Sequence, residues 1–583
     1  MNKYDKYLNE IIEEIFDEKQ YLEKNIFNEV GKILKETCIG KKFAIWGSGD
    51  HTTQLYKYFS SEIKDAEFIL DNDKSKEGKK FLKFDIRYPD VEKIKLIDVI
   101  LISSFSCVEQ IEEQIKKMDV EVEVINIYDK LEKKGVKLQA AFYSDASIYT
   151  DIYKLKKAFN EKKQENILKD IILNYLKIRD INNAKKYINI YINNNYDKYN
   201  KMIELLRRLE YIENDIIDRI NEKAKDNIFI FYWDALRYKD VHSKNTQMKY
   251  INSILNQSTY FTNTYSPSIF TYDSVQTILT GLDKNNAEIK DKKIVSDEHC
   301  EFIKEAQSKG YKIKIYTNYW DIIEGEKIEH FNSDYATLTI WNAVCNMAAS
   351  SDSKNIYILY FWQETHPPHF CGNHEKIPFE HSTPFSGSKC TMQSQEDYNN
   401  QYNECLRYID EVMEYYYSIL GENTLKILFS DHGQIIEQAT YELKDIGTLA
   451  GWHDDRVHIP LVITGGHISK KRIDGLFSMS KFNEIMKLIL DKKQISLDIE
   501  DKIYFRFSKM YNAIMVNNYK KAKMEDYVHG FIVYMNDKYK CVITGNNKIR
   551  YFYKSNDNEI FDKKEIENIK SLFEEEINMK HIF

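Results

Sequence analysis

Hydrophobic residues recur in two patterns along the chain, and the pattern changes several times. Residues 1–36 place isoleucine, leucine and aromatic residues at helical spacing among acids and lysines, which predicts an N-terminal helical segment. Short apolar runs then alternate with polar, helix-like stretches, at 42–46, 66–73, 98–104 and 122–128. Strands that alternate with helices are typical of a parallel sheet, so residues 37–135 are expected to form an α/β domain.

The remainder of the chain divides near residue 227. Residues 136–226 contain neither glycine nor proline and are rich in amphipathic runs, which predicts a helical spacer. A longer α/β pattern covers 227–583. Its apolar runs predict strands at 227–233, 311–317, 355–362, 424–430 and 459–465. From about residue 500, shorter runs predict a small antiparallel sheet and a terminal helix at 563–577.

Polar side chains follow three of the predicted strands of the long domain. Asp234 follows the first, residues 363–366 (Gln-Glu-Thr-His) follow the third, and residues 431–433 (Asp-His-Gly) follow the fourth. In an open α/β sheet, ligands bind beyond the carboxyl ends of the strands. Carboxylate and imidazole groups are ligands for divalent metals. The sequence therefore predicts a metal site at this edge.

A predicted helix begins at Thr271, carries an apolar stripe and ends at Gly281. Thr271 is interpreted either as a plain N-cap or as a nucleophile, because a helix N-terminus favours a phosphate and a neighbouring metal activates a hydroxyl. His374 and His381 are interpreted as ordinary loop residues.

Composition narrows the classes of function. The chain has 83 Lys and Arg against 91 Asp and Glu, a net charge of −8, so it lacks the basic excess of a nucleic-acid-binding protein. Its eight cysteines are irregularly spaced without a C-x-x-C pair, which indicates free thiols in a reducing compartment. No apolar signal segment or membrane-spanning stretch is found, so a cytoplasmic location is expected, with a peripheral place at a membrane left open.

The scarce residues gather in one part of the long domain. Six of the seven prolines lie between residues 267 and 460, and eight of the fourteen histidines lie between 366 and 467. This span also contains Thr271 and the Asp-His-Gly segment. The clustering indicates that the strand-end loops of this domain form the functional site.

Several segments together resemble the alkaline phosphatase/sulfatase superfamily. The stretch from Thr271 to Gly281 resembles its nucleophile segment, and Asp234 matches the metal-binding Asp after the opening strand. Asp431 and His432 match its Asp-His-Gly metal motif. His366, in Thr-His-Pro-Pro-His, and His453 match histidines that act on the substrate. The resemblance spans about 225–560 and implies a large, mostly parallel sheet with helices on both faces.

Departures from the sulfatase pattern refine the expected chemistry. Sulfatases form formylglycine from Cys or Ser in a Cys-x-Pro-x-Arg frame, whereas this chain has Thr271, Asp273 and Val275 at the corresponding positions. A threonine nucleophile resembles the phosphoethanolamine and phosphoglycerol transferases and the nucleotide phosphodiesterases. Ala235 replaces a second metal-binding Asp, which favours one ion. The resemblance implies Zn²⁺ or Mn²⁺, with Mg²⁺ and Ca²⁺ left open, bound by Asp234, Thr271, Asp431 and His432.

The resulting hypothesis is a metal-dependent phosphotransferase. Thr271 would take up a phospho-alcohol group, such as a phosphoethanolamine- or phosphoglycerol-like group, from a phosphorylated small molecule or a nucleotide-activated donor. His366 and His453 would bind phosphoryl oxygens or protonate the leaving group. A glycan or other hydroxyl acceptor would then receive the group. The alternatives are a phosphodiesterase, phosphatase or sulfatase-like hydrolase with water as acceptor, and a non-catalytic interaction protein that keeps the fold.

A glycine-containing turn follows the first strand of the N-terminal α/β domain. Gly47 and Gly49 match two glycines of a dinucleotide-binding fingerprint, Thr52 replaces the third, and Asp71 lies where a ribose-binding acid is expected. The pattern resembles the Rossmann-like modules attached to bacterial sugar-modifying enzymes. The two hypotheses are a nucleotide site at Gly47, Gly49 and Asp71 and a purely structural or docking role.

Overall fold

The computed structural model groups the chain into two compact units. One comprises Met1–Ile11, Lys163–His374 and Ser394–Phe583, and the other comprises Ile12–Lys162 and Glu375–Gln393. The residues that the structure describes are 2–16, 26–105, 107–134, 138, 141–142, 148–194, 196, 199–223, 226–283, 286, 295–317, 323–331, 335–351, 354–366, 369–374, 395–436, 452–497, 499–508, 516, 519–520 and 524–579. The predicted domain boundaries at 36, 135 and 226 stay predictions.

The N-terminal unit is built around a six-stranded sheet of order β3-β4-β2-β1-β5-β6. Its strands are β1 (Phe43–Trp46), β2 (Ile69–Leu70), β3 (Lys80–Phe81), β4 (Phe84–Arg87), β5 (Val99–Ile102) and β6 (Glu123–Asn126). All but β3 run parallel. Numbered along the chain, these five strands stand in the order 3-2-1-4-5 of a doubly wound, Rossmann-like sheet.

Every residue of β1 is buried, which shows that both faces of this sheet are covered. Phe43 and Ile45 pack with helix α2 (Ile26–Cys38) in one apolar cluster. Ala44 and Trp46 point the other way and pack with helix α5 (Val108–Lys117). The other helices of the unit are α3 (Asp50–Ile63), α4 (Val91–Ile94), α6 (Ile127–Lys133) and α8 (Ile148–Lys162).

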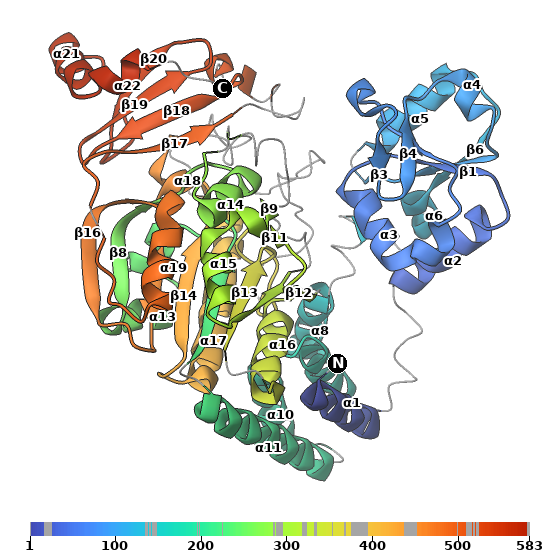
Figure 1. Ribbon diagram of the computed structural model, residues 1–583. Coiled ribbons are helices and arrows are strands. Elements are labelled where there is room, and N and C mark those ends of the chain that lie inside the picture. The colour runs from blue at the N-terminus through green and yellow to red at the C-terminus, as the bar shows by residue number, and fades with distance from the viewer. Residues whose placement is uncertain are drawn as a thin grey trace. The chain divides into compact units, whose positions relative to one another are not determined.

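The larger unit contains an eight-stranded sheet of order β12-β10-β13-β7-β14-β15-β8-β16 (Figure 1). Its strands are β7 (Asn227–Trp233), β8 (Thr259–Tyr265), β10 (Lys312–Tyr316), β12 (Ile328–Phe331), β13 (Asn355–Phe361), β14 (Leu425–Ser430), β15 (Leu461–Thr464) and β16 (Lys471–Ser478). The first five strands in this order are parallel, and β15 runs antiparallel to both of its neighbours. A mostly parallel sheet confirms the predicted fold class. Three of its strands, β8, β12 and β16, were not predicted.

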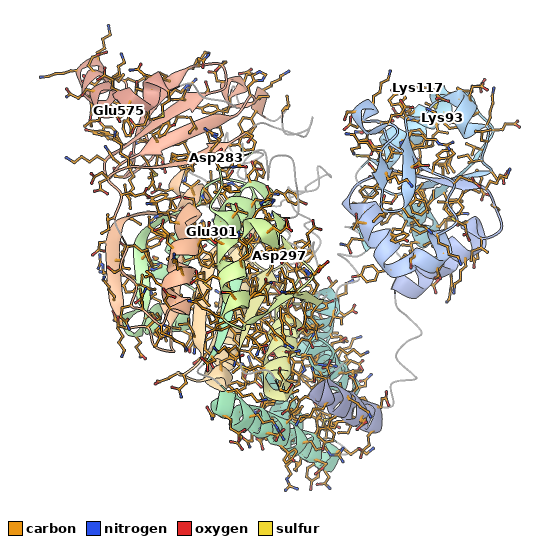
Figure 2. All side chains as sticks on the ribbon, in the orientation of Figure 1. Lys93, Lys117, Asp283, Asp297, Glu301 and Glu575 are labelled. Atoms are coloured by element: carbon orange, nitrogen blue, oxygen red, sulfur yellow. The ribbon has the colours of Figure 1, made fainter. Side chains whose placement is uncertain are left out.

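Helices cover both faces of this sheet, as predicted. Alternate residues of β7 pack with α14 (Thr271–Thr280), α15 (Glu301–Ser308) and α19 (Phe482–Leu490). On the opposite face, Phe231 contacts Tyr417 of α17 (Gln395–Leu420), and α16 (Ala336–Ala349) packs on β13. Figure 2 shows the side chains that fill this unit, with the exposed acids Glu301 and Glu575 at its outside.

The part of the predicted helical spacer from Lys163 onward belongs to the larger unit, whereas α8 belongs to the N-terminal unit. It contains α9 (Glu165–Lys177), α10 (Ile181–Asn193) and α11 (Tyr199–Lys223), and α11 lies against α16 and α17. Arg179, between α9 and α10, donates to Asp5 of helix α1 (Lys3–Phe16) at 2.9 Å, and Trp341 of α16 donates to the same carboxylate oxygen at 3.0 Å. The N-terminal helix is thereby fixed to this unit.

The C-terminal part forms the predicted small antiparallel sheet, with the strand order β17-β18-β19-β20 (Figure 1). Its strands are β17 (Ile503–Phe507), β18 (Phe531–Met535), β19 (Tyr539–Thr544) and β20 (Ile549–Tyr553). The predicted terminal helix is divided at Phe573 into α21 (Lys563–Leu572) and α22 (Glu574–Asn578).

Short elements complete the larger unit, namely β9 (Val295–Ser296), β11 (Ile323–Glu324), α12 (Tyr238–His242), α13 (Lys249–Ile254) and α18 (Asp454–Val457). Among the described helices, none has a stretch long and apolar enough to cross a lipid bilayer. The cysteines of the described residues form no disulfide with one another, and Cys390 lies outside those residues.

Candidate active site

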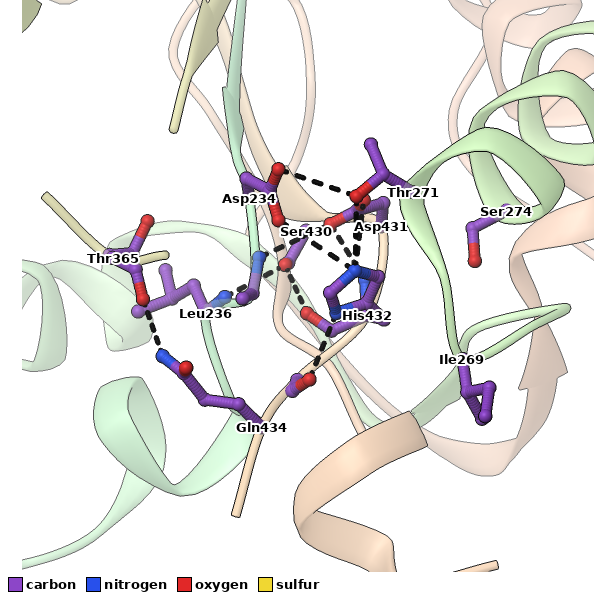
Figure 3. A network of polar contacts seen from close by, with 12 residues as sticks. Asp234, Leu236, Ile269, Thr271, Ser274, Thr365, Ser430, Asp431, His432 and Gln434 are labelled. Carbon is purple, nitrogen blue, oxygen red and sulfur yellow. Dashed lines mark hydrogen bonds and ion pairs between the residues drawn. The ribbon is translucent and has the colours of Figure 1, made fainter. Parts of the chain in front are cut away.

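Strand register brings two carboxylates together at the carboxyl edge of the large sheet. Strands β7 and β14 are parallel neighbours, and Trp233 pairs with Ser430 at their ends. The next residue on each strand is an aspartate, so Asp234 and Asp431 lie side by side (Figure 3). Both are buried. His432 follows directly, and all three side chains offer ligand atoms that lie within 4.8 Å of one another.

Thr271 reaches the same point from helix α14. The predicted N-cap role is wrong, because Phe270 occupies the N-cap and Thr271 is the first helical residue. Its Oγ1 lies 3.4 Å from Asp234 Oδ2 and 3.2 Å from His432 Nε2. Figure 3 shows the hydroxyl turned toward these two groups. The helix ends at Gly281 with φ 73°, which confirms the predicted glycine stop.

Hydrogen bonds orient His432 for metal binding. Its Nδ1 lies 2.9 Å from the carbonyl oxygen of Gly433, which can only accept, so Nδ1 carries the proton. Nε2 then has a free lone pair and faces Asp234 Oδ1 at 3.7 Å and Asp431 Oδ2 at 3.6 Å. A backbone carbonyl that fixes the tautomer in this way is the usual partner of a metal-binding histidine.

Two buried carboxylate oxygens indicate that a cation belongs in this cluster. Asp234 Oδ1 and Asp431 Oδ2 have no hydrogen-bond partner among the described residues. Burial and the neighbouring Asp431 hold the pKa of Asp234 well above its usual value, and burial raises the pKa of Asp431 to about 6. Two adjacent buried acids are unfavourable, and the guanidinium of Arg456 offsets their effect on the pKa of Asp234 only in part. Two carboxylate oxygens and one imidazole nitrogen therefore fit a divalent metal ion.

The structure adds residues that the sequence did not reveal. Tyr360, near the end of β13, donates a hydrogen bond to Asp234 Oδ2, the oxygen nearest Thr271. Arg456 is buried, donates from Nη1 to the Gly433 carbonyl oxygen at 2.6 Å, and helps burial to lower the pKa of His432. Tyr360 falls within a continuous apolar run, so no sequence pattern marked it. Arg456 stands just before β15, in a segment where the sequence pattern marked only His453.

Close packing explains the glycine of the Asp-His-Gly segment. A Cβ at Gly433 would stand 2.1 Å from the carbonyl oxygen of Asp455. The Gly433 amide also donates to the carbonyl oxygen of Arg456 at 2.8 Å. The backbone after His432 is therefore held directly against the segment that carries Arg456.

The two predicted substrate-binding histidines occupy different surroundings. His366 lies near enough to His432 to lower the pKa of its imidazole, after burial and Arg456. His453 is the N-cap of α18. Its Nδ1 accepts from Asp455 N at 3.1 Å and lies 3.7 Å from Asp557 Oδ2. Among the described residues, His366 is thus associated with the Asp431–His432 cluster, whereas the polar contacts of His453 are with Asp455 and Asp557.

The glycine turn of the N-terminal unit is held by internal contacts. Gly47 has φ +120°, and a Cβ there would stand 2.8 Å from the Ser103 carbonyl oxygen. Asp71 accepts from Ser48 N at 3.1 Å and from Lys76 Nζ at 3.0 Å. Thr52 donates to the Gly47 carbonyl oxygen at 2.6 Å. These contacts give Asp71 a role in the turn itself, and nucleotide binding at Gly47, Gly49 and Asp71 stays a prediction.

Comparisons with solved structures find similar folds at low sequence identity. A phosphonate monoester hydrolase from Silicibacter pomeroyi is 12% identical, with 61% of this chain and 96% of that chain covered and a TM-score of 0.46. A phosphonate monoester hydrolase of Agrobacterium radiobacter is 10% identical, with 60% of this chain and 94% of that chain covered and a TM-score of 0.43. A Vibrio parahaemolyticus protein of the alkaline phosphatase superfamily is 11% identical, with 63% of this chain and 97% of that chain covered and a TM-score of 0.40. No curated protein sequence matches the chain.

The family model described as Sulfatase matches residues 226–491. The matched stretch contains β7, β14 and α14, and therefore every residue of the Asp234–Thr271–Asp431–His432 cluster. Enzymes of this superfamily are hydrolases or transferases that use a divalent metal ion. On this match, residues 226–491 are similar to the Sulfatase family, and with it to the alkaline phosphatase/sulfatase superfamily.

Proposed function

We propose that this protein is a metal-dependent phosphotransferase that uses Thr271 as its nucleophile. The observation that carries the proposal is the position of the Thr271 hydroxyl, 3.4 Å from Asp234 Oδ2 and 3.2 Å from His432 Nε2. A hydroxyl at this position belongs to the same cluster as the buried ligand atoms. A purely structural threonine at a helix start would direct its hydroxyl to the helix backbone instead.

Asp234, Asp431, His432 and the Thr271 hydroxyl would hold one Zn²⁺ or Mn²⁺ ion. A divalent ion at this point lowers the pKa of a neighbouring hydroxyl and stabilises negative charge on phosphoryl oxygens. Tyr360 holds the Asp234 carboxylate through its hydrogen bond to Oδ2, and Gly433 holds the His432 ring through its carbonyl oxygen. The N-terminus of α14 presents backbone N–H groups that favour a bound phosphoryl group.

The proposed reaction has two steps. In the first, Thr271 Oγ1 passes its proton to Asp234 Oδ2 and forms a bond to phosphorus, while the bond from phosphorus to the leaving oxygen breaks. The leaving oxygen takes a proton from His366 or His453. In the second, the acceptor hydroxyl gives its proton to the same imidazole and bonds to phosphorus, while the Thr271–phosphorus bond breaks and Thr271 regains its proton.

We infer a phospho-alcohol group as the transferred group and a glycan or other hydroxyl compound as the acceptor. Threonine cannot be converted to formylglycine, which disfavours sulfate-ester hydrolysis of the sulfatase type. Water in place of the acceptor gives a phosphodiesterase with the same first step. Product analysis separates the two, because transfer yields a new phosphodiester and hydrolysis yields the free phosphate monoester.

The experiment is a search for the covalent intermediate. The protein is incubated with Mn²⁺ or Zn²⁺ and bis(4-nitrophenyl) phosphate as the phosphodiester probe, quenched in acid and digested for mass spectrometry. The peptide that contains Thr271 should gain a 4-nitrophenyl phosphate group. Thr271→Ala should lose this mass and lower the release of 4-nitrophenol by at least about 10³-fold.

A matched control is Thr280→Ala, at the far end of the same helix. The Thr280 hydroxyl donates to the Gln276 carbonyl oxygen at 2.7 Å, so its loss tests the helix without touching the cluster. This variant should keep most of the activity. Full activity in Thr271→Ala, with no covalent adduct in the wild type, would contradict the proposal.

A further inference from the structure

A second cluster of metal-ligand side chains lies outside the Asp431–His432 site. Cys371 and His374 belong to the segment after β13, and Cys405 belongs to helix α17. All three are buried, with exposed fractions of 0%, 1% and 0%. Their ligand atoms lie within 4.8 Å of one another. The sequence interpretation of His374 as an ordinary loop residue is not consistent with this burial.

The geometry around His374 is that of a metal-binding histidine. Its Nδ1 lies 2.8 Å from Glu404 Oε2, which is an acceptor, so Nδ1 carries a proton. Its Nε2 lies 3.8 Å from Cys405 Sγ and 2.9 Å from the carbonyl oxygen of His369. A carboxylate on the far nitrogen is the arrangement that orients histidines bound to zinc. Nε2 is therefore the ligand atom, and a metal ion would replace its proton.

The donor set and spacing favour zinc. Two thiolates and one imidazole supply three of the four ligands of a tetrahedral zinc site, and a water molecule would take the fourth position. With bond lengths of about 2.3 Å to sulfur and about 2.0 Å to nitrogen, a tetrahedral ion places the two ligand atoms about 3.5 Å apart. The observed separation of 3.8 Å between Cys405 Sγ and His374 Nε2 is close to this value. Complete burial leaves no access for a substrate, so a catalytic thiol is not favoured.

The surrounding contacts show what such an ion would hold. Tyr175 of α9 donates to the Gly372 carbonyl oxygen at 2.7 Å, between the two loop ligands. Asn373 donates to Glu411 of α17 at 3.0 Å. The Phe370 amide donates to the Gln363 carbonyl oxygen at 3.1 Å, which ties the segment back to the end of β13. The cluster thus joins the segment that follows His366 to helix α17.

We propose that Cys371, His374 and Cys405 bind a Zn²⁺ ion that fixes the segment after His366 onto α17. On binding, each thiol and His374 Nε2 would lose a proton to solvent, and each sulfur and Nε2 would bond to the ion, with no change of oxidation state. The site is separate from the proposed catalytic metal, which has no sulfur ligand. Its existence therefore does not depend on the proposed transferase activity.

The first test uses the wild-type chain with Co²⁺ in place of Zn²⁺. Cobalt bound to thiolates gives a sulfur-to-metal charge-transfer band in the near ultraviolet, whereas cobalt bound by Asp234, Asp431 and His432 does not. We expect this band to appear with one equivalent of bound Co²⁺ and to disappear on addition of Zn²⁺. Absence of the band in reduced, folded protein would overturn the proposal.

The second test counts zinc in variants. The double variant Asp234→Asn, Asp431→Asn should retain one zinc per chain by elemental analysis, and adding Cys405→Ser should remove it. Cys300→Ser is the matched control, because Cys300 is also buried but its sulfur contacts the Ser296 carbonyl oxygen at 3.7 Å. This control should leave the zinc content unchanged. Mass spectrometry that finds Cys371 and Cys405 joined by a disulfide, or equal zinc in both cysteine variants, would also overturn the proposal.

Discussion

Replacing Asp431 with asparagine should stabilise the metal-free protein and abolish its stabilisation by metal. Asparagine keeps an oxygen for the amides of Ala235 and His432, which Asp431 Oδ1 accepts at 3.2 and 2.8 Å. Its amide nitrogen can donate to Asp234 Oδ1, which has no partner among the described residues. The substitution therefore removes a buried charge while it preserves the shape and the existing hydrogen bonds.

The magnitude follows from the cost of burying the Asp431 carboxylate, and the repulsion between two neighbouring carboxylates gives a second, independent figure. Burial raises the pKa of Asp431 from 3.8 to about 6, and each pKa unit corresponds to about 1.4 kcal/mol, so the carboxylate costs about 3 kcal/mol. Two charges within 4.8 Å of each other at an effective dielectric constant of about 20 repel by at least about 3 kcal/mol. The free energy of unfolding of Asp431→Asn should therefore exceed that of the wild type by about 3 kcal/mol.

The difference in the free energy of unfolding between Asp431→Asn and the wild type depends on pH. The folded wild type holds a proton on Asp431 that the unfolded chain has lost between about pH 4 and about pH 6, so its stability falls as pH rises through this window. The stability of Asp431→Asn does not fall in this window, because asparagine has no carboxyl group to titrate. Its advantage should be absent near pH 4 and complete above about pH 6. Thermal unfolding after chelation, followed by circular dichroism at pH 4 and pH 7.5, measures both values.

Added metal should make the wild type more stable than Asp431→Asn. At a free ion concentration about 1,000 times the Kd, binding stabilises the wild type by about 4 kcal/mol, and the variant gains little. The control is Asp240→Asn, because Asp240 accepts from Arg237 Nη2 at 2.6 Å and both are buried. That variant should be destabilised by about 3–5 kcal/mol, with or without metal. Comparable destabilisation of metal-free Asp431→Asn at pH 7.5 would refute the reasoning.

Two further predictions concern groups that support the cluster. Tyr360→Phe removes the hydroxyl that donates to Asp234 Oδ2 and should weaken metal binding about 10- to 100-fold in a competition titration. Tyr316→Phe, a buried tyrosine on β10, should leave the affinity unchanged, and equal affinities in all three proteins would exclude a role for Tyr360. Gly433→Ala should destabilise the larger unit by at least about 2 kcal/mol in chemical unfolding, because its Cβ would meet the Asp455 carbonyl oxygen at 2.1 Å. Gly49→Ala, where a Cβ meets nothing within 4 Å, should have little effect, and similar stability of Gly433→Ala would show that the Asp455 segment moves away freely.

The sequence predicted those parts of the fold and site that depend on the pattern of neighbouring residues along the chain. Nearly continuous apolar runs marked β7, β13 and β14, because strands buried on both faces are mostly apolar. Asp234 and Asp431 could be expected near each other because each follows such a strand. In contrast, β8 has the sequence Thr-Tyr-Phe-Thr-Asn-Thr-Tyr, in which polar residues hide the strand pattern.

Long-range packing set the features that the sequence did not indicate. The N-cap of α14 is Phe270. Thr271 is the first helical residue, and its hydroxyl lies near Asp234 and His432, which follow β7 and β14. His374 is buried by contacts with Glu404 and the His369 backbone. Such partners are separated by many residues or by irregular loops. Local propensity carries no information about them.

The reversed direction of β15 brings both ends of the preceding connection to the candidate site. The chain leaves the sheet at Asp431 and returns to the same edge at Leu461, since β14 and β15 are antiparallel neighbours. Asp431 and His432 lie at one end of this connection, and Arg456, which donates to the Gly433 carbonyl oxygen, lies near the other. A graft that replaces the whole connection would therefore remove groups of the cluster from both ends and should abolish metal binding.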